Sequence, residues 1–345
     1  MSLSLAVKYR PHDWASVVEQ DSVKIILQNQ LDTGEIKNSL LFVGGAGTGK
    51  TTSARIYANE LNKGMGNPIE LDAASNNGVD DVRNIIKQAQ SKSLDSEYKV
   101  FIIDECHALS NSAWQAMLKL IEEPPAKSVF IFCTTNPEKI PKTILSRVQR
   151  YDFKMISQDG IIDRLQYILE CENRDALEWN WEDDAIEYIA KLADGHLRDS
   201  LTMLDKCLAY STDLTLENVV KALGTTDYET MFELLDDMLK QDIKSCFDVI
   251  EEVHSEGKDL KQFVHTFIAF LLDISKYGIG CEWKYISIPQ IDEYIKYIQN
   301  MSGQQYDLVN DWLKSFIRLN ADIKYSATPK IDIECMLMEV LNENI

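Results

Sequence analysis

The sequence predicts an α/β protein in which a parallel-sheet domain is followed by helical domains. Three observations support this prediction. In the first 150 residues, short apolar runs alternate with helical stretches, as they do in parallel sheets. A glycine-rich loop follows the first of these runs. After about residue 150 the strand pattern fades, and only two of the eight prolines lie there, so that helices are expected to dominate.

The apolar runs are predicted strands of one sheet, because each is short and ends at glycine, an acidic residue or threonine. They are Ser39–Val43, Ile69–Leu71, Lys99–Ile103 and Ser128–Cys133. Between the last two, apolar residues recur at i, i+3, i+4 and i+7 and predict one buried helix face: Trp114, Met117, Leu118 and Ile121. The pair Pro124–Pro125 is predicted to end this helix.

Helical periodicity continues through the second half of the chain. One predicted apolar stripe consists of Val264, Phe267, Ile268, Leu271 and Leu272, and another of Phe232, Leu235 and Leu239. A break at Gly224–Thr226 is expected to separate two helical bundles. The predicted domains are therefore residues 1–150, 151–224 and 225–345.

The charge of the chain is unevenly distributed. The net charge is −20, but residues 1–150 carry 17 basic and 17 acidic side chains, so the whole excess lies beyond them. This excludes a generally basic nucleic-acid coat and leaves the first domain as the place for a DNA contact. No apolar run of membrane-spanning length and no secretory signal pattern is present. Seven cysteines without a CxxC pair indicate a reducing compartment and argue against a disulfide or zinc framework.

The glycine-rich loop fits the phosphate-binding pattern GxxxxGK[ST], followed by a predicted helix. Its residues are Gly44, Gly45, Ala46, Gly47, Thr48, Gly49, Lys50 and Thr51, with Thr52 next in the helix. Backbone N–H groups of such a loop surround phosphates, and Lys50 would reach the β- and γ-phosphates. Thr51 would ligate Mg²⁺. The alternative is a glycine-rich turn with an incidental lysine, which the flanking strand and helix disfavour.

Two acidic residues end the third apolar run, where ligands of open α/β sheets collect. Asp104 is expected to hold Mg²⁺ through water, and Glu105 to orient or deprotonate the attacking water. An acidic pair here favours hydrolysis over phosphoryl transfer to a metabolite. Cys106 and His107 follow directly, but no further residues complete a metal-ligand set, so a packed cysteine and a satisfied histidine are favoured.

A series of motifs in this order resembles the ATPase subunits of the bacterial DNA polymerase III clamp loader (the gamma/tau family). More distantly, it is similar to the small subunits of replication factor C. The motifs are Lys8-Tyr9-Arg10-Pro11, the phosphate loop, the DAASNNGVD segment Asp72–Asp80, Asp104-Glu105, Leu118-Lys119, Glu122-Glu123-Pro124-Pro125, Thr134-Thr135, Leu145-Ser146-Arg147 and Gly195-His196-Leu197-Arg198-Asp199. The resemblance is dense over residues 5–225 and only architectural beyond.

The resemblance implies an AAA+ fold, with a RecA-like domain at residues 1–150, a helical lid at 151–224 and a helical collar at 225–345 that forms oligomers. ATP and Mg²⁺ would be the cofactors, with ATP bound at subunit interfaces of a pentamer. The implied partners are other clamp-loader subunits, a sliding clamp and primer-template DNA, with no membrane. The implied location is the bacterial or phage-infected bacterial cytoplasm.

The same resemblance implies roles for individual residues. Thr134, or its neighbour Thr135, would sense the γ-phosphate. Arg147 would be an arginine finger that reaches the ATP of a neighbouring subunit, and Arg198 would bring the lid onto the phosphates. Such arginines stabilise the charge that develops on the transferred phosphoryl group. The positions expected near the adenine are Tyr9, Arg10 and Pro11, and those expected to contact DNA are Asn76, Asn77 and Lys119.

The sequence departs from the family pattern at three places. Only residues 62–68 occupy the position of the usual cysteine-rich zinc module, so no zinc site is expected. Val148 replaces the cysteine that usually follows the finger, and Glu19 stands where the family usually has glycine.

Two alternative functions stay open beside an active clamp-loader ATPase. One is a non-catalytic scaffold subunit of a clamp loader, which the intact Lys50, Thr51, Asp104 and Glu105 disfavour. The other is a different AAA+ DNA motor, such as a branch-migration helicase, which the DAASNN and EEPP segments and the long helical tail disfavour.

Overall fold

The computed structural model describes residues 3–91, 95–174, 179–223 and 227–342. The chain divides into two compact units, Met1–Trp179 with Ile189–Asp205, and Asn180–Tyr188 with Lys206–Ile345. Helices α8 (Asp183–Leu192) and α9 (Leu197–Tyr210) have residues in both units. The predicted break at Gly224–Thr226 lies outside the described residues.

A five-stranded parallel sheet forms the centre of the first unit, in the order β2-β3-β4-β1-β5. Its strands are β1 (Ser39–Val43), β2 (Ile69–Asp72), β3 (Lys99–Asp104), β4 (Ser128–Thr134) and β5 (Gln149–Asp152). The predicted strands are therefore confirmed, and β5 is an addition. Among the described strands, β5 pairs only with β1, and Tyr151 is its one buried residue, so no apolar run marks it in the sequence.

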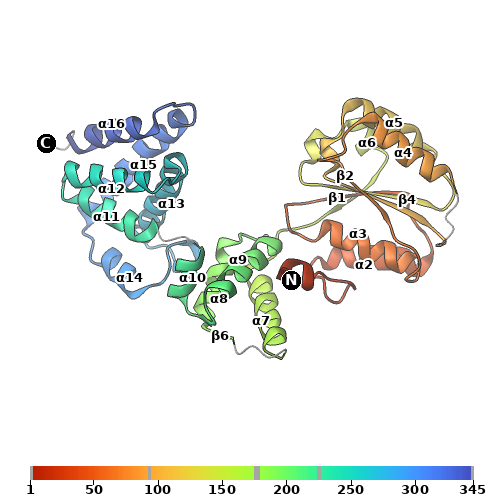
Figure 1. Cartoon of the computed structure of the whole chain (residues 1–345), viewed down its shortest axis with the longest axis horizontal. Helices are drawn as coiled ribbons and strands as arrows, with labels where there is room; N and C mark the ends of the chain where they lie inside the picture. Colours follow the sequence, from red (N-terminus) through yellow and green to blue (C-terminus); the bar gives the residue numbers. More distant parts are fainter. Residues whose placement is uncertain (1–2, 92–94, 175–178, 224–226, 343–345) are drawn as a thin grey trace. The chain divides into compact units, whose positions relative to one another are not determined.

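Helices cover both faces of this sheet (Figure 1). Helices α2 (Asp21–Thr33) and α3 (Lys50–Leu61) pack on one face, in a core that includes Leu27 and Tyr57. Helices α4 (Val79–Gln90), α5 (Asn111–Glu122) and α6 (Lys142–Leu145) pack on the other. The short helices α1 (Leu5–Lys8), η1 (Cys106–Ala108) and η2 (Pro137–Lys139) and the long α7 (Gln158–Arg174) complete the unit.

Helix α5 confirms the predicted helix, with one correction to its buried face. It ends at Glu122, directly before the proline pair, as expected. Trp114, Met117 and Ile121 are buried, but the fourth buried large residue is Leu120, and Leu118 is only partly buried. The helix packs against α4 as well as against the sheet, so its buried face is wider than one stripe and turned toward Leu120.

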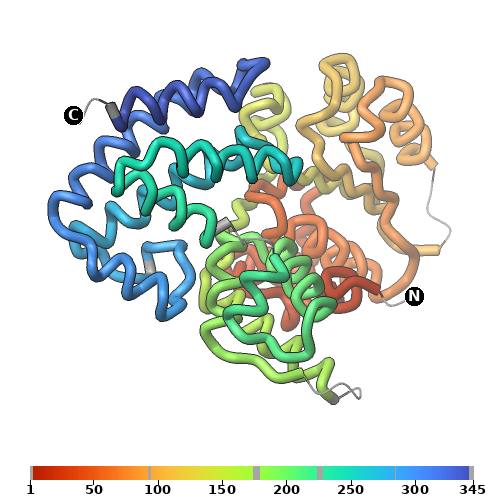
Figure 2. The backbone as a smooth tube through the Cα atoms, turned by 60° about the vertical axis from the view of Figure 1, so that its left-hand side comes forward, coloured from red at the N-terminus to blue at the C-terminus, as the bar shows by residue number. Residues whose placement is uncertain are grey.

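The second unit is helical apart from a two-residue parallel pair, β6 (Asn180–Trp181) with β7 (Asp213–Leu214). Its remaining helices are α10 (Leu216–Leu223), α11 (Asp227–Leu239), α12 (Ile243–Ser255), α13 (Leu260–Gly278), η3 (Trp283–Tyr285), α14 (Asp292–Gln299), α15 (Gly303–Ile323) and α16 (Pro329–Asn342). Helix α13 packs on α15, α11 on α12, and α16 on both α12 and α15 (Figure 2).

None of the helices in the described ranges has the length and hydropathy needed to cross a membrane.

The two apolar stripes predicted for this unit are only partly right. In α13, Val264, Phe267 and Leu271 are buried, whereas Ile268 is partly buried and Leu272 is 43% exposed. In α11, Leu239 is only partly buried. Each helix packs against more than one neighbour, so the buried surface extends to residues outside a single stripe, among them Phe263, Phe270, Leu234 and Met238.

Candidate functional site

The predicted nucleotide residues surround one cavity of about 310 Å³ in the first unit. It lies at the carboxyl ends of the strands, where β4 separates β1 from β3. Most of the predicted residues line it: Tyr9, Arg10, Pro11, Ala46, Gly47, Thr48, Gly49, Lys50, Thr51, Thr52, Asp104, Glu105 and Arg198. The remaining loop residues, Gly44 and Gly45, connect β1 to this group. The sheet edge therefore brings together segments that are far apart in the sequence.

The phosphate loop requires glycine where other parts of the unit approach it. A Cβ at Gly44 would lie 2.5 Å from the carbonyl oxygen of Phe153. Gly47 has φ +67°, and a Cβ there would lie 3.1 Å from the backbone nitrogen of Arg198. A side chain at Gly44 is thus excluded by lack of space. A side chain at Gly47 is disfavoured by the positive φ angle as well as by the close approach of Arg198. The loop leads directly into α3, whose first residue is Lys50, so free backbone N–H groups face the cavity.

Lys50 is 6% exposed, and its ammonium group donates hydrogen bonds to the carbonyl oxygens of Gly44 (3.0 Å) and Gly45 (2.7 Å). Burial lowers the pKa of Lys50, while the nearby Glu105 and Asp104 act in the opposite direction. A desolvated ammonium group interacts more strongly with an anion than a hydrated one does. Lys50 is therefore suited to bind phosphate.

The two predicted metal ligands are in direct contact. The Thr51 hydroxyl donates a hydrogen bond of 2.8 Å to Oδ2 of Asp104. Thr51 is the second residue of α3, and Asp104 is the last residue of β3. A hydroxyl and a carboxylate oxygen at this separation are a donor set that suits Mg²⁺, which prefers oxygen ligands and keeps several waters.

Glu105 is held beside this pair by neighbours on two segments. The Thr135 hydroxyl donates to Oε2 of Glu105 at 3.2 Å, and Nδ1 of His107 lies 3.2 Å from the same oxygen. The same Nδ1 is 3.1 Å from the hydroxyl of Thr134. Thr134 is fully buried, whereas Thr135 is half-buried. Of the two sensor candidates, Thr135 is the one in contact with Glu105.

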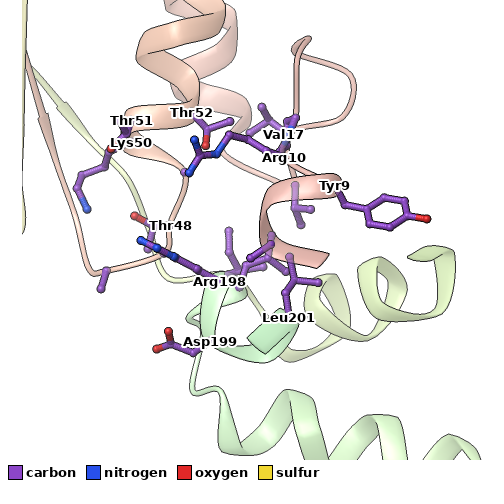
Figure 3. A pocket seen from close by; sticks show the side chains of 18 of the residues that line it. Tyr9, Arg10, Val17, Thr48, Lys50, Thr51, Thr52, Arg198, Asp199 and Leu201 are labelled. Carbon is purple, nitrogen blue, oxygen red and sulfur yellow. The ribbon is translucent and has the colours of Figure 1, made fainter. Parts of the chain in front are cut away.

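Figure 3 shows how the cationic side chains lie around the cavity. The guanidinium group of Arg198, from the start of α9, points toward Thr48, and that of Arg10 points toward Thr52. The ring of Tyr9 points away from the phosphate loop. The adenine-side role expected for Tyr9, Arg10 and Pro11 stays a prediction.

Arg147 and the predicted DNA contacts lie outside the residues that line this cavity. Arg147 is exposed, and its Nε donates to Oε1 of Glu122 at 2.7 Å. Asn76 and Asn77 are exposed in the loop between β2 and α4, and Lys119 is exposed on α5. The structure therefore leaves these four side chains accessible to other molecules.

Sequence reasoning missed several residues that line the cavity, because each is supplied by a segment without a recognisable motif. Arg164, on α7, donates from Nη2 to the carbonyl oxygen of Tyr9 at 2.8 Å. The missed apolar lining residues are Ala6, Val17, Val18, Ile156 and Leu201. His107 was interpreted only as a satisfied histidine, and its contact with Glu105 could not be read from its position in the sequence.

The side chains of Glu19 and Gln20 connect the loop before α2 to the segment that leads into α7. Gln20 donates from Nε2 to the carbonyl oxygen of Lys154 (2.7 Å) and accepts from its backbone N–H (3.0 Å). Both carboxylate oxygens of Glu19 accept from the backbone N–H of Ser157 at 3.2 Å, and the Ser157 hydroxyl also donates to Glu19. Ser157 directly precedes α7, so Glu19 places a negative charge at that helix N-terminus.

Glu19→Ala is expected to destabilise the first unit by about 1 kcal/mol, the usual cost of losing a helix N-terminal interaction. Glu19 has φ +53°, which alanine disfavours as much as glutamate does, so the substitution isolates the contribution of the carboxylate. Urea unfolding would measure the change. The exposed Glu35, replaced by alanine, is the matched control, and equal stability of both variants would contradict this role of Glu19.

Three family models match consecutive parts of the chain. Residues 67–157 match the DNA polymerase III delta subunit. Residues 160–213 match the ATPase lid domain of the DNA polymerase III clamp loader subunit. Residues 214–341 match domain III of the DNA polymerase III subunits gamma and tau.

Curated relatives agree with these matches. The DNA polymerase III subunit tau of Bacillus subtilis is 32% identical over 96% of this chain and 62% of its own length. The subunit gamma of Buchnera aphidicola (subsp. Acyrthosiphon pisum) is 30% identical over 98% of both chains. The chain spans between 48% and 62% of the length of the first three curated relatives.

Solved structures support the fold. The RuvB Holliday junction branch migration motor of Thermotoga maritima superposes with a TM-score of 0.53 at 19% identity, over 73% of this chain and 86% of the other. This likeness concerns the fold alone and agrees with the expected AAA+ architecture of a parallel sheet followed by helices. Together with the near full-length match to a gamma subunit, these findings show that the chain belongs to the family of DNA polymerase III gamma/tau subunits.

Proposed function

We propose that this chain is an ATPase subunit of a DNA sliding-clamp loader, which couples ATP binding and hydrolysis to loading of the clamp on primed DNA. The observation that carries the proposal is the contact of 2.8 Å between Thr51 and Asp104, in the same cavity as Lys50 and Glu105. A scaffold subunit would have no need of a complete hydrolytic set. The family of the chain supports the clamp as the object of this activity.

The proposed domain organisation follows the sequence prediction. Residues 1–150 form the nucleotide-binding domain, 151–224 the lid and 225–345 the collar. The collar contains a continuous buried core from α11 to α16. We propose that it mediates assembly with other clamp-loader subunits in a pentamer.

Mg²⁺ is the proposed metal cofactor. Its protein ligands would be the Thr51 hydroxyl and, directly or through water, the Asp104 carboxylate. When bound, the ion neutralises charge on the β- and γ-phosphates of ATP. Lys50 and the backbone N–H groups at the start of α3 bind these phosphates.

Glu105 acts as the general base that takes a proton from the attacking water. Its carboxylate needs a fixed orientation for this step, and the Thr135 hydroxyl and His107 supply one through their contacts at 3.2 Å. Arg198 places positive charge from the lid near the phosphates, and the arginine finger Arg147 supplies it from a neighbouring subunit. Thr135, directly after β4, contacts the Glu105 carboxylate through its hydroxyl. Thr134, at the buried end of β4, contacts His107, which also lies beside Glu105.

The test is ATP hydrolysis by the intact chain, alone and with clamp and primed DNA. Hydrolysis that primed DNA and clamp stimulate together supports the proposal. Bound ATP without turnover under any condition indicates the scaffold alternative. Stimulation by branched DNA without any effect of the clamp indicates another AAA+ motor.

Lys50→Ala is expected to weaken ATP binding at least tenfold and thereby to remove hydrolysis, since the variant loses a charge-assisted contact to phosphate. Equilibrium titration with labelled ATP measures the loss. Lys37→Ala is the control, because Lys37 is exposed and precedes β1, whereas the phosphate loop follows that strand. Unchanged ATP affinity in Lys50→Ala would overturn the phosphate role of the loop.

We also propose that DNA contacts the first domain through Asn76, Asn77 and Lys119. Lys119→Glu is expected to reduce stimulation of hydrolysis by primed DNA several-fold while the basal rate stays unchanged, because charge reversal affects a phosphate contact and not the cavity. The dependence of stimulation on salt concentration should also become shallower. Lys37→Glu is the matched control, and an equal loss in both variants would show only a general charge effect.

A further inference from the structure

We propose that Arg10 binds the phosphate chain of the nucleotide and leaves the base to the apolar side of the cavity. The inference rests on the proposed ATP site and assigns Arg10 a role other than the adenine contact that the family resemblance implies. The ligand class is a nucleoside di- or triphosphate, and the recognised group is its polyphosphate.

The Arg10 side chain is directed toward the phosphate loop and the helix that follows it (Figure 3). Arg10 lines the same cavity as the phosphate loop, and its guanidinium group points toward Thr52 in the first turn of α3 (Figure 3). Backbone N–H groups of this turn are the ones that surround phosphate. Leu201, an apolar lining residue, lies on the side of the cavity away from Lys50 (Figure 3). The guanidinium group thus lies on the phosphate side.

Arg10 differs from several other arginines in having no carboxylate partner among the described residues. Arg55, Arg83 and Arg150 each form an ion pair, with Glu70, Asp80 and Asp152 respectively. Within the described part of the chain, neither Arg10 nor Arg198 has an acidic side chain at ion-pair distance. Two unpaired guanidinium groups and the Lys50 ammonium group therefore face one cavity.

Electrostatics agree with this arrangement. Burial lowers the pKa of Arg10, and repulsion from Arg55 and Arg198 lowers it further, whereas Glu70 and Asp104 act in the opposite direction. Arg10 is therefore close enough to these cations for their charges to oppose one another. A polyphosphate between Arg10, Arg198 and Lys50 would replace this repulsion by charge-assisted hydrogen bonds. A neutral base between these groups would not offset their repulsion, because it carries no negative charge.

The experiment compares ATP with a ligand that has no base. Binding of a fluorescent ATP analogue is measured in the parent chain and in Arg10→Ala and Arg10→Lys. Unlabelled ATP, GTP and inorganic tripolyphosphate then serve as competitors. The exposed Arg83, replaced by alanine, is the matched control, since Arg83 lies on α4 outside the cavity. Thermal unfolding of every variant verifies that it is folded.

The expected result is that Arg10→Ala weakens ATP and tripolyphosphate by a similar factor, roughly tenfold or more, as for loss of a hydrogen bond to a charged group. The preference for ATP over GTP should be unchanged, and Arg10→Lys should recover part of the affinity. Unchanged tripolyphosphate affinity together with a lost ATP preference would place Arg10 on the base and overturn the inference. No change with any competitor would overturn it as well. A parent chain that binds neither ATP nor tripolyphosphate would instead overturn the proposed function itself.

Discussion

Glu105→Gln is expected to retain ATP in the cavity while hydrolysis falls on the order of 10²-fold or more, the usual contribution of a general base. Glutamine preserves the size of the side chain and an oxygen that can accept from Thr135, so the contacts at the end of β4 are retained. The amide cannot take a proton from water. Binding and catalysis should therefore separate in this variant.

Two measurements verify this separation. Equilibrium binding of ATP should be within a few-fold of the parent, and single-turnover hydrolysis should be slowed. Glu123→Gln is the control, because Glu123 is an exposed glutamate at the end of α5, outside the cavity. Equal turnover in Glu105→Gln and the parent would show that Glu105 is not the general base.

Much of the sheet could be predicted from the sequence, because buried strands of a parallel sheet consist of uninterrupted apolar residues. Ser39–Val43 is buried at every position, and the prediction of this strand matches its ends. Gln149–Asp152 was missed because its other three residues are polar and only Tyr151 is buried, so that it carries no apolar run. In the same way, Leu120 could not be assigned to the core before the neighbours of α5 were known.

The candidate site was predictable where a chemical role fixes both residue type and spacing. The loop ending in Lys50 and Thr51 needs glycines and a following helix, and Asp104 needs the end of a strand. The contact of Thr51 with Asp104 agrees with both expectations. These two segments are 53 positions apart, and the parallel sheet places their ends on one edge.

The rest of the site depends on tertiary contacts that leave no pattern in the sequence. Arg164 reaches the cavity because α7 lies beside the N-terminal segment, and no motif in the sequence marks this position of α7. Gln20 pairs with the backbone of Lys154, which lies 134 positions away. Glu19 was noticed as a departure from the family, but its contact with Ser157 required the structure. The directions of neighbouring side chains could not be predicted from the sequence either, as the different orientations of Tyr9 and Arg10 show (Figure 3).

Arg147→Ala is expected to lower ATP turnover on the order of 10³-fold, as loss of an arginine finger does. In the single chain, Arg147 is exposed and bound to Glu122, and its Nη1 donates to the carbonyl oxygen of Thr143 at 2.8 Å. It is not among the described residues that line the cavity around Lys50. We therefore expect Arg147 to act on the nucleotide of a neighbouring subunit and to exchange Glu122 for phosphate there. An exposed ion pair of this kind contributes little to stability, so breaking it costs little free energy.

A mixture of two inactive variants tests whether the arginine acts between subunits. Lys50→Ala has a defective phosphate site and an intact Arg147, and Arg147→Ala has the reverse. If Arg147 acts on a neighbour, each variant alone is inactive, but the mixture recovers part of the hydrolysis, because some interfaces combine an intact site with an intact arginine. Arg150→Ala is the matched control, since Arg150 is exposed nearby and pairs with Asp152. Absence of recovery at every mixing ratio, with assembly verified by native mass, would show that Arg147 acts within its own chain or not at all.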